Sequence, residues 1–182
     1  VDGLKDDLTT PYANENVYVK TSKAGVTKKI VSEHTGTLED ANTVAIGDTV
    51  TYQLNADIPM YKEDARGIYY ELTDTMSAGL TFTGITSVEI GNDGEGWNPA
   101  DYDATLANKE RDKPGATVKI KLTTDEQLRA NRKVKVILKA ELNDKANVGA
   151  SGNPNSVDLK YSNSYTGGED SYTTPEDTVI TY

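Results

Sequence analysis

The sequence contains no cysteine. This absence excludes disulfide bonds, thiolate catalysis and zinc or iron–sulfur sites with cysteine ligands. Any covalent crosslink in the chain must therefore use other side chains. Histidine is almost absent as well, because His34 is the only one, and its polar loop predicts a solvated side chain rather than a catalytic base or a metal ligand.

Long apolar runs and an excess of positive charge are also missing. No stretch approaches the about 20 apolar residues that cross a bilayer. The 29 acidic residues outnumber the 19 basic ones, and the net charge of -10 repels nucleic acid and anionic membranes. The sequence predicts a soluble, acidic fragment with no nucleic-acid partner and no membrane insertion. Because it begins at Val1 without a signal peptide, we expect a processed or excised piece of a longer protein.

What the sequence does contain is apolar and polar residues in alternation. Between Asp48 and Ile58, the apolar residues occupy every second position, as in a strand with one buried face. Similar patterns predict further short strands at 26–31, 68–74, 80–82, 87–90, 118–122, 133–142 and 156–162. Only 124–130 reads as a short helix, opened by a Thr cap. Many short strands with almost no helix predict an all-β sandwich of two packed sheets.

The predicted organisation is one domain with flanking segments. Residues 1–16 show little apolar pattern and are expected to form an N-terminal arm or linker. Residues 17–182 are expected to form the β-sandwich, with 173–182 leading toward a following domain. The stretch 91–114 is rich in Gly, Asn, Asp and Pro, which predicts a long excursion on the surface.

Three polar residues share the parity of buried faces. Lys28 alternates in phase with Val26 and Ile30, and Asp74 and Asn155 are likewise in phase with the apolar residues of their strands, so each should point inward. A buried, unpaired charge costs several kcal/mol, so such groups normally have partners. Taken singly, Lys28 could extend past the sheet edge, Asp74 could cap a turn and Asn155 could start a strand. Parity alone favours these ordinary explanations.

Together, the three residues permit an amide exchange that needs no cofactor. Desolvation lowers the pKa of a lysine and raises that of an aspartate, so the pair can exist as a neutral amine and a neutral acid. The amine of Lys28 can then attack the side-chain carbonyl of Asn155 while Asp74 polarises that carbonyl and transfers protons. The product would be a Lys-Asn isopeptide bond, with ammonia released.

The order of several sequence blocks resembles a known family. The blocks are VTKKIV, VAIGDTVTYQLNADIP, YYELTDTMSAGLTF, KVKVILKAELNDKANVGASGNPNSVDLKYSN and TTPEDTVITY. They resemble the fimbrial isopeptide-forming domain, a Cna A-type immunoglobulin-like fold, of sortase-assembled Gram-positive pilins and surface adhesins. The resemblance covers roughly Val17 to Tyr182. It implies that Lys28 and Asn155 are the crosslinked residues and that Asp74 is the catalytic acid, with Lys29 and Asn163 as alternative crosslink residues.

The family's pilin motif, a YPKN-like sequence with a sortase acceptor lysine, corresponds here to VYVKTSKAG. The possible acceptor is Lys20, with Lys23 nearby, but the motif's Pro and Asn are missing. The resemblance therefore leaves two alternatives. Either the chain is an adhesin, tip or basal module that is not polymerised through this segment, or its acceptor is degenerate.

The expected function is that of a structural stalk or adhesin module on the pilus or cell wall, outside the cell, with neighbouring domains or pilin subunits as partners. The alternative is a module that binds a host matrix protein or glycan through 91–114. An enzyme is the least favoured class. No cofactor or metal is expected, although acidic residues of the excursion leave calcium binding open without matching an EF-hand. These residues are Asp93, Glu95, Asp101 and Asp103.

Overall fold

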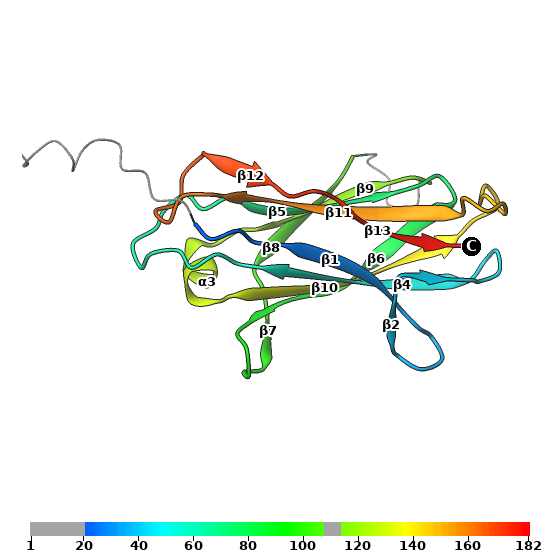
Figure 1. The fold of residues 1–182 in the computed structure, drawn as a ribbon, viewed down its shortest axis with the longest axis horizontal. Helices are drawn as coiled ribbons and strands as arrows, with labels where there is room; N and C mark the ends of the chain where they lie inside the picture. Colours follow the sequence, from blue (N-terminus) through cyan, green and yellow to red (C-terminus); the bar gives the residue numbers. More distant parts are fainter. Residues whose placement is uncertain (1–20, 108–113) are drawn as a thin grey trace, which may run out of the picture.

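The computed structural model describes residues 21–107 and 114–182, which form two β-sheets packed face to face (Figure 1). The predicted immunoglobulin-like β-sandwich is thereby confirmed. None of the helices in this described part of the chain is both long and apolar enough to cross a bilayer. The predicted arm at 1–16 and the possible acceptor Lys20 lie outside the described residues.

The first sheet contains six strands around a centre formed by β4 and β10. In spatial order they are β2 (Leu38–Glu39), β1 (Val26–Val31), β4 (Thr49–Asp57), β10 (Lys133–Leu142), β6 (Leu80–Gly91) and β7 (Trp97–Pro99). Neighbouring strands of this sheet are antiparallel. Near the sheet edge, β1 also contacts β11 and β13 of the opposite sheet.

The second sheet has β11 and β5 near its centre. In spatial order its strands are β3 (Ala41–Asn42), β13 (Asp177–Thr181), β11 (Asn153–Ser162), β5 (Tyr70–Met76), β9 (Thr117–Leu122) and β8 (Tyr102–Leu106), and β12 (Ser171–Thr173) pairs with β11 beside this path. β13 and β3 run parallel to each other, whereas β13 and β11 are antiparallel. Thus the segment predicted to lead onward, 173–182, contributes β13 to the sandwich; a domain after it stays a prediction.

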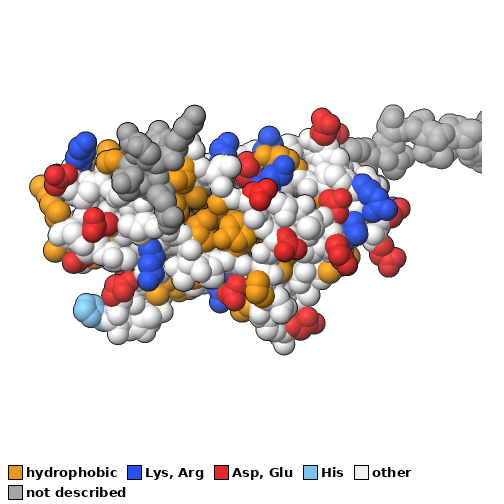
Figure 2. Space-filling model, turned by 180° about the vertical axis from the view of Figure 1, so that it is seen from behind, with side chains coloured by type: hydrophobic (Ala, Val, Ile, Leu, Met, Phe, Trp, Pro, Cys, Tyr) orange, Lys and Arg blue, Asp and Glu red, His pale blue; other side chains and the backbone are white. Residues whose placement is uncertain are grey.

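The core lies between the sheets, where the alternating apolar residues meet. On β4, Val50, Tyr52, Leu54 and Ala56 are all buried, as their spacing predicts. The inward residues of β10, β5 and β11 are buried in the same way. Acidic and basic side chains are scattered over the face shown in Figure 2, around exposed hydrophobic side chains near its centre. The sequence pattern thus specifies which face of each central strand packs inward.

Some elements differ from their predictions. The two short strands expected at 80–82 and 87–90 form one strand, β6, whose pairing with β10 shifts register twice. The predicted helix is α3 (Asp125–Ala130), but Thr124 makes no side-chain capping bond; instead, Asp125 accepts hydrogen bonds from the backbone of Gly67 and Ile68. The surface excursion contains two edge strands, β7 and β8. They were not predicted because the segment is rich in Gly and Asn, a composition typical of loops.

Candidate functional site

The three polar residues with inward parity come from three strands and from both sheets. Lys28 lies on β1 of the first sheet, whereas Asp74 on β5 and Asn155 on β11 belong to the second. Asp74 pairs with Val157 and Asn155 with Met76, so Asp74 and Asn155 are diagonal neighbours on the inner face. All three side chains are 0% exposed. The inward orientation predicted from parity is therefore confirmed.

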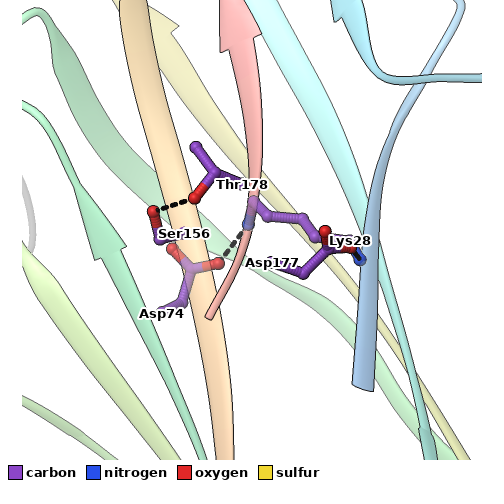
Figure 3. A network of polar contacts seen from close by, with 5 residues as sticks. All are labelled: Lys28, Asp74, Ser156, Asp177 and Thr178. Atoms are coloured by element: carbon purple, nitrogen blue, oxygen red, sulfur yellow. Dashed lines mark hydrogen bonds and ion pairs between the residues drawn. The ribbon is translucent and has the colours of Figure 1, made fainter. Parts of the chain in front are cut away.

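Lys28 and Asp74 meet between the sheets. Lys28 Nζ donates a hydrogen bond to Asp74 Oδ2 (Figure 3). Burial lowers the pKa of Lys28 below its ordinary value, although the charge and hydrogen bond of Asp74 oppose this shift. Burial likewise raises the pKa of Asp74, against the opposing effects of Lys28 and Asn155. Both directions favour a neutral amine beside a neutral acid, since desolvation penalises the charged forms.

The carboxamide of Asn155 is buried without a hydrogen-bond partner among the described residues, and this holds for both its nitrogen and its oxygen. It lies close enough to Asp74 and Tyr52 to lower the pKa of each, although no contact reaches hydrogen-bonding geometry. Leaving buried polar atoms unpaired costs about 1 to 3 kcal/mol per group. This unpaired carboxamide lies near the point where the amine of Lys28 and the carboxyl group of Asp74 meet.

Two further polar groups lie in the same buried cluster. The ring of Tyr52 on β4 lies 4.4 Å from Lys28 Nζ, measured to its centroid. The Tyr52 hydroxyl and Thr181 Oγ1, on β13, are both buried and have no hydrogen-bond partner within the described ranges. Neither residue could be placed near the cluster from the sequence. Tyr52 is in phase with Val50 and Leu54, which is typical of an ordinary core position. Thr181 lies on β13, whose pairing partners β11 and β3 are distant in the sequence.

Asp177 positions Lys28 from the second sheet. The backbone N–H of Lys28 donates a 2.7 Å hydrogen bond to Asp177 Oδ2 on β13 (Figure 3). This contact joins β1 to the opposite sheet at the residue whose side chain enters the core. Sequence parity could not reveal it, because the acceptor side chain binds a backbone group on a distant strand.

Removing this carboxylate should loosen β1. We expect Asp177→Ala to lower the free energy of unfolding by about 1 to 2 kcal/mol, since a hydrogen bond to a charged acceptor is lost. Asp177→Asn keeps a side-chain oxygen and should lose less. Urea denaturation of the two variants measures the difference, and equal stability of wild type and Asp177→Ala would show that the contact does not hold β1.

The alternative crosslink residues lie elsewhere. Lys29 points outward, where Nζ lies 2.6 Å from Asp40 Oδ1 at the surface. Asn163 follows the end of β11, about 26 Å beyond Asn155 at about 3.3 Å per residue. Its backbone bonds to Thr21 and Asp170. The structure thus brings Lys28, rather than Lys29, together with Asp74.

The acidic residues of the excursion do not converge. Asp93 forms an ion pair with Lys133, and the backbone N–H of Asp101 donates to Gln127 Oε1. Within residues 21–107 and 114–182, no group of three or more His, Asp or Glu side chains is arranged to hold a metal ion. Calcium binding therefore gains no support from these four acidic residues.

Comparison with known proteins identifies similar domains. Residues 46–165 match the family model for Gram-positive pilin backbone subunit 2, Cna-B-like domain. The trypsin-resistant surface T6 protein of Streptococcus pyogenes serotype M6 is 30% identical over 159 residues, which are 82% of this chain and 28% of that protein. The chain thus spans less than a third of this curated relative.

Solved structures share the fold at low identity. The T6 backbone pilin of Streptococcus pyogenes superposes with a TM-score of 0.60 at 24% identity, over 88% of this chain and 36% of that one. The major pilin BcpA of Bacillus cereus gives a TM-score of 0.60 at 17% identity, over 88% and 40%. The matching family is described as Cna-B-like, whereas the sequence resemblance implied the Cna A-type. Sequence blocks locate strands without fixing how the strands pair, so they distinguish these types poorly.

Proposed function

We propose that this chain, which belongs to the family of Gram-positive pilin backbone subunits with a Cna-B-like domain, is a structural module whose two sheets are joined by an isopeptide bond between Lys28 and Asn155. Its place would be outside the cell, in a pilus or at the cell wall, with neighbouring domains or pilin subunits as partners. The crosslink would form once per molecule, so the chain is not an enzyme in the sense of turning over a substrate.

One observation carries the proposal: a buried amine, a buried carboxyl group and an unpaired carboxamide converge between the two sheets. As an inert arrangement this cluster would be destabilising, because three polar side chains are desolvated and both polar atoms of the Asn155 carboxamide lack partners among the residues that the structure describes. As a reactive arrangement it has the nucleophile, the acid and the electrophile that amide exchange needs. Reaction also removes the buried amine as an ionisable group.

The reaction balances within these three side chains. The neutral Nζ of Lys28 attacks Cγ of Asn155, and a C–N bond forms while the carbonyl electrons move to Oδ1. Asp74 accepts a proton from Nζ and delivers one to Nδ2, so that the Cγ–Nδ2 bond breaks and ammonia leaves. Asp74 ends in its initial protonation state. None of these reaction steps uses a cofactor or a metal.

The first test is the mass of the intact chain. We expect purified protein to be lighter than its sequence by one ammonia, because the exchange expels one. Proteolysis followed by mass spectrometry should give a branched peptide that joins the segments around Lys28 and Asn155. An unmodified mass in folded protein would contradict the crosslink, whereas a branch through Lys29 or Asn163 would replace the assigned residues.

The host-ligand alternative stays a prediction. An apolar groove of about 310 Å³ lies beside the excursion, lined by side chains of β6, β8 and β9. Its lining residues are Phe82, Ile85, Tyr102, Ala104, Leu106 and Val118. Nothing in this groove selects a matrix protein or a glycan. The buried cluster therefore supports the structural role more strongly.

A further inference from the structure

Tyr52 contacts Lys28, the nucleophile of the proposed crosslink, from the first sheet, whereas Asp74 contacts Lys28 from the second sheet. Tyr52 lies on β4 in the first sheet, and its side chain is 0% exposed. The ring is 4.4 Å from Lys28 Nζ, and Lys28 pairs with Leu54, the next inward residue of the same strand. The tyrosine ring thus packs against the amine of Lys28 in the core.

The Tyr52 hydroxyl is part of a group of unpaired polar atoms. Asn155 Oδ1, Asn155 Nδ2, Asp74 Oδ1 and Thr181 Oγ1 are also buried without a hydrogen-bond partner in the described part of the chain, and these three residues lie near enough to Tyr52 to shift its pKa. Buried hydroxyl groups of tyrosine usually find a partner. The other buried tyrosines of the described core follow this rule. Tyr61 donates to Ser162 O, Tyr70 donates to Asp57 O, and the Tyr161 hydroxyl accepts from the backbone N–H of Ala24. Tyr52 is therefore placed for a bond that the unreacted side chains do not make.

A further hydrogen-bond donor at this point would accelerate the crosslinking reaction. The single proton of Asp74 cannot polarise Asn155 Oδ1 and transfer between the two nitrogens at the same moment. A preorganised hydrogen-bond donor aimed at the developing oxyanion stabilises the transition state more than the ground state. Burial raises the pKa of Tyr52 above its ordinary value, although Thr181 and Asn155 oppose the shift. The phenol accordingly stays protonated and acts as a donor rather than as a base.

We propose that Tyr52 is a second catalytic residue of the crosslinking reaction, which donates a hydrogen bond to Asn155 Oδ1 as negative charge develops there. This inference rests on the proposed isopeptide function. When Nζ bonds to Cγ, the carbonyl electrons move to Oδ1, and the Tyr52 hydroxyl stabilises that charge without giving up its proton. When the Cγ–Nδ2 bond breaks, the electrons return, and Tyr52 remains bonded to the carbonyl of the new amide.

Tyr52→Phe tests the role of the hydroxyl while keeping the ring beside Lys28. Protein made in a short pulse of cell-free synthesis is quenched in denaturant at intervals, and the fraction that has lost ammonia is measured by intact mass. We expect the crosslink to form about 100-fold more slowly, the smaller of the effects seen when one oxyanion donor is removed. On long incubation the variant should still reach the crosslinked mass, because all three reacting groups remain.

Tyr70→Phe is the matched control. It removes the hydroxyl of another fully buried core tyrosine, whose 2.7 Å bond goes to the backbone of Asp57 rather than to the reacting groups. We expect this control to crosslink at the wild-type rate. A second comparison separates chemistry from folding: in the Lys28→Met background, where no crosslink can form, adding Tyr52→Phe should leave the melting temperature nearly unchanged.

The outcomes separate the two proposals. If the wild type never loses ammonia, the isopeptide function fails. If the wild type crosslinks and Tyr52→Phe does so at the same rate, only the role of Tyr52 is overturned. The role is equally overturned if Tyr52→Phe strongly lowers the melting temperature in the Lys28→Met background, or if Tyr70→Phe slows the reaction as much, because the delay would then reflect a damaged core.

Discussion

Asp74→Ala should fold into the same sandwich yet keep the full, unreacted mass of its sequence. The carboxyl group contributes little apolar packing, but without it no group beside Lys28 Nζ can transfer the proton to the leaving nitrogen. The missing crosslink would otherwise close a loop of more than 100 residues between Lys28 and Asn155. If loop entropy acts as it does for disulfides, its loss destabilises the protein by about 4 to 5 kcal/mol.

This loss should lower the melting temperature by roughly 10 to 20 °C, at about 2 to 4 °C per kcal/mol for a chain of this size. Calorimetry, intact mass and circular dichroism on one preparation would measure the effect. Lys28→Met is the control, because it also prevents the bond but leaves no buried, unpaired amine. The difference between the two variants compares the cost of a buried, unpaired amine with that of a buried, unpaired carboxyl group. A normal rate of crosslinking in Asp74→Ala would show that another carboxylate is the acid; Glu71, which accepts a bond from the Tyr69 hydroxyl, would then need testing.

Gly79→Ala should destabilise the start of β11, which carries Asn155. A Cβ on Gly79 would collide with Asn153 Oδ1 and come within 2.7 Å of the Ala146 Cα. Asn153 is fully engaged there: its Nδ2 donates to the carbonyl oxygens of Asn147 and Thr181, and its Oδ1 accepts from the backbone of Asn147. We expect a loss of about 2 to 3 kcal/mol, the upper range for overpacking, and slower crosslinking because Asn155 is displaced.

Gly96→Ala is the matched control for this substitution. A Cβ at Gly96 meets nothing within 4 Å, and its backbone is not in the left-handed region. Its stability should stay within about 0.5 kcal/mol of wild type. Thermal unfolding and the time course of ammonia loss measure both variants. A Gly79→Ala protein that melts and matures like Gly96→Ala would mean that the loop before β11 adapts without affecting the site.

The sequence predicts much of the sandwich because each central strand carries its own signal. The alternation of Val50, Tyr52 and Leu54 specifies a strand and its buried face without reference to any partner. The same alternation predicted that Lys28 and Asp74 point inward. Edge strands such as β8 lack this signal, since both of their faces are largely exposed and their composition resembles that of a loop.

Contacts that depend on how distant strands pair could not be predicted. Asp177 bonds to the backbone of Lys28 only because β13 lies across from β1. Tyr52 has the pattern of an ordinary core tyrosine; only the structure shows that its hydroxyl lies near Asn155 and lacks a partner within 21–107 and 114–182. The inward positions of Lys28, Asp74 and Asn155 could be predicted from the sequence, because a polar side chain in phase with apolar neighbours is conspicuous. The two residues near them lack such a signal, because Tyr52 is an aromatic residue at an ordinary core position and Asp177 is a partly buried acid at the start of a short strand.

The positions of Lys28 on β1 and Asn155 near the start of β11 also determine how the module would transmit tension. With the bond in place, a pull between the two ends of the sandwich would pass from β1 through the side-chain amide into β11. Strands β4, β5, β6, β9 and β10 lie within the closed loop and would bear none of the force. Among the described residues, only 21–27 and 156–182 lie outside this loop and could then unravel, and 156–182 would add roughly 90 Å at about 3.3 Å per residue. The bond would thus limit the extension of the module under load to these outer segments and keep the looped strands folded.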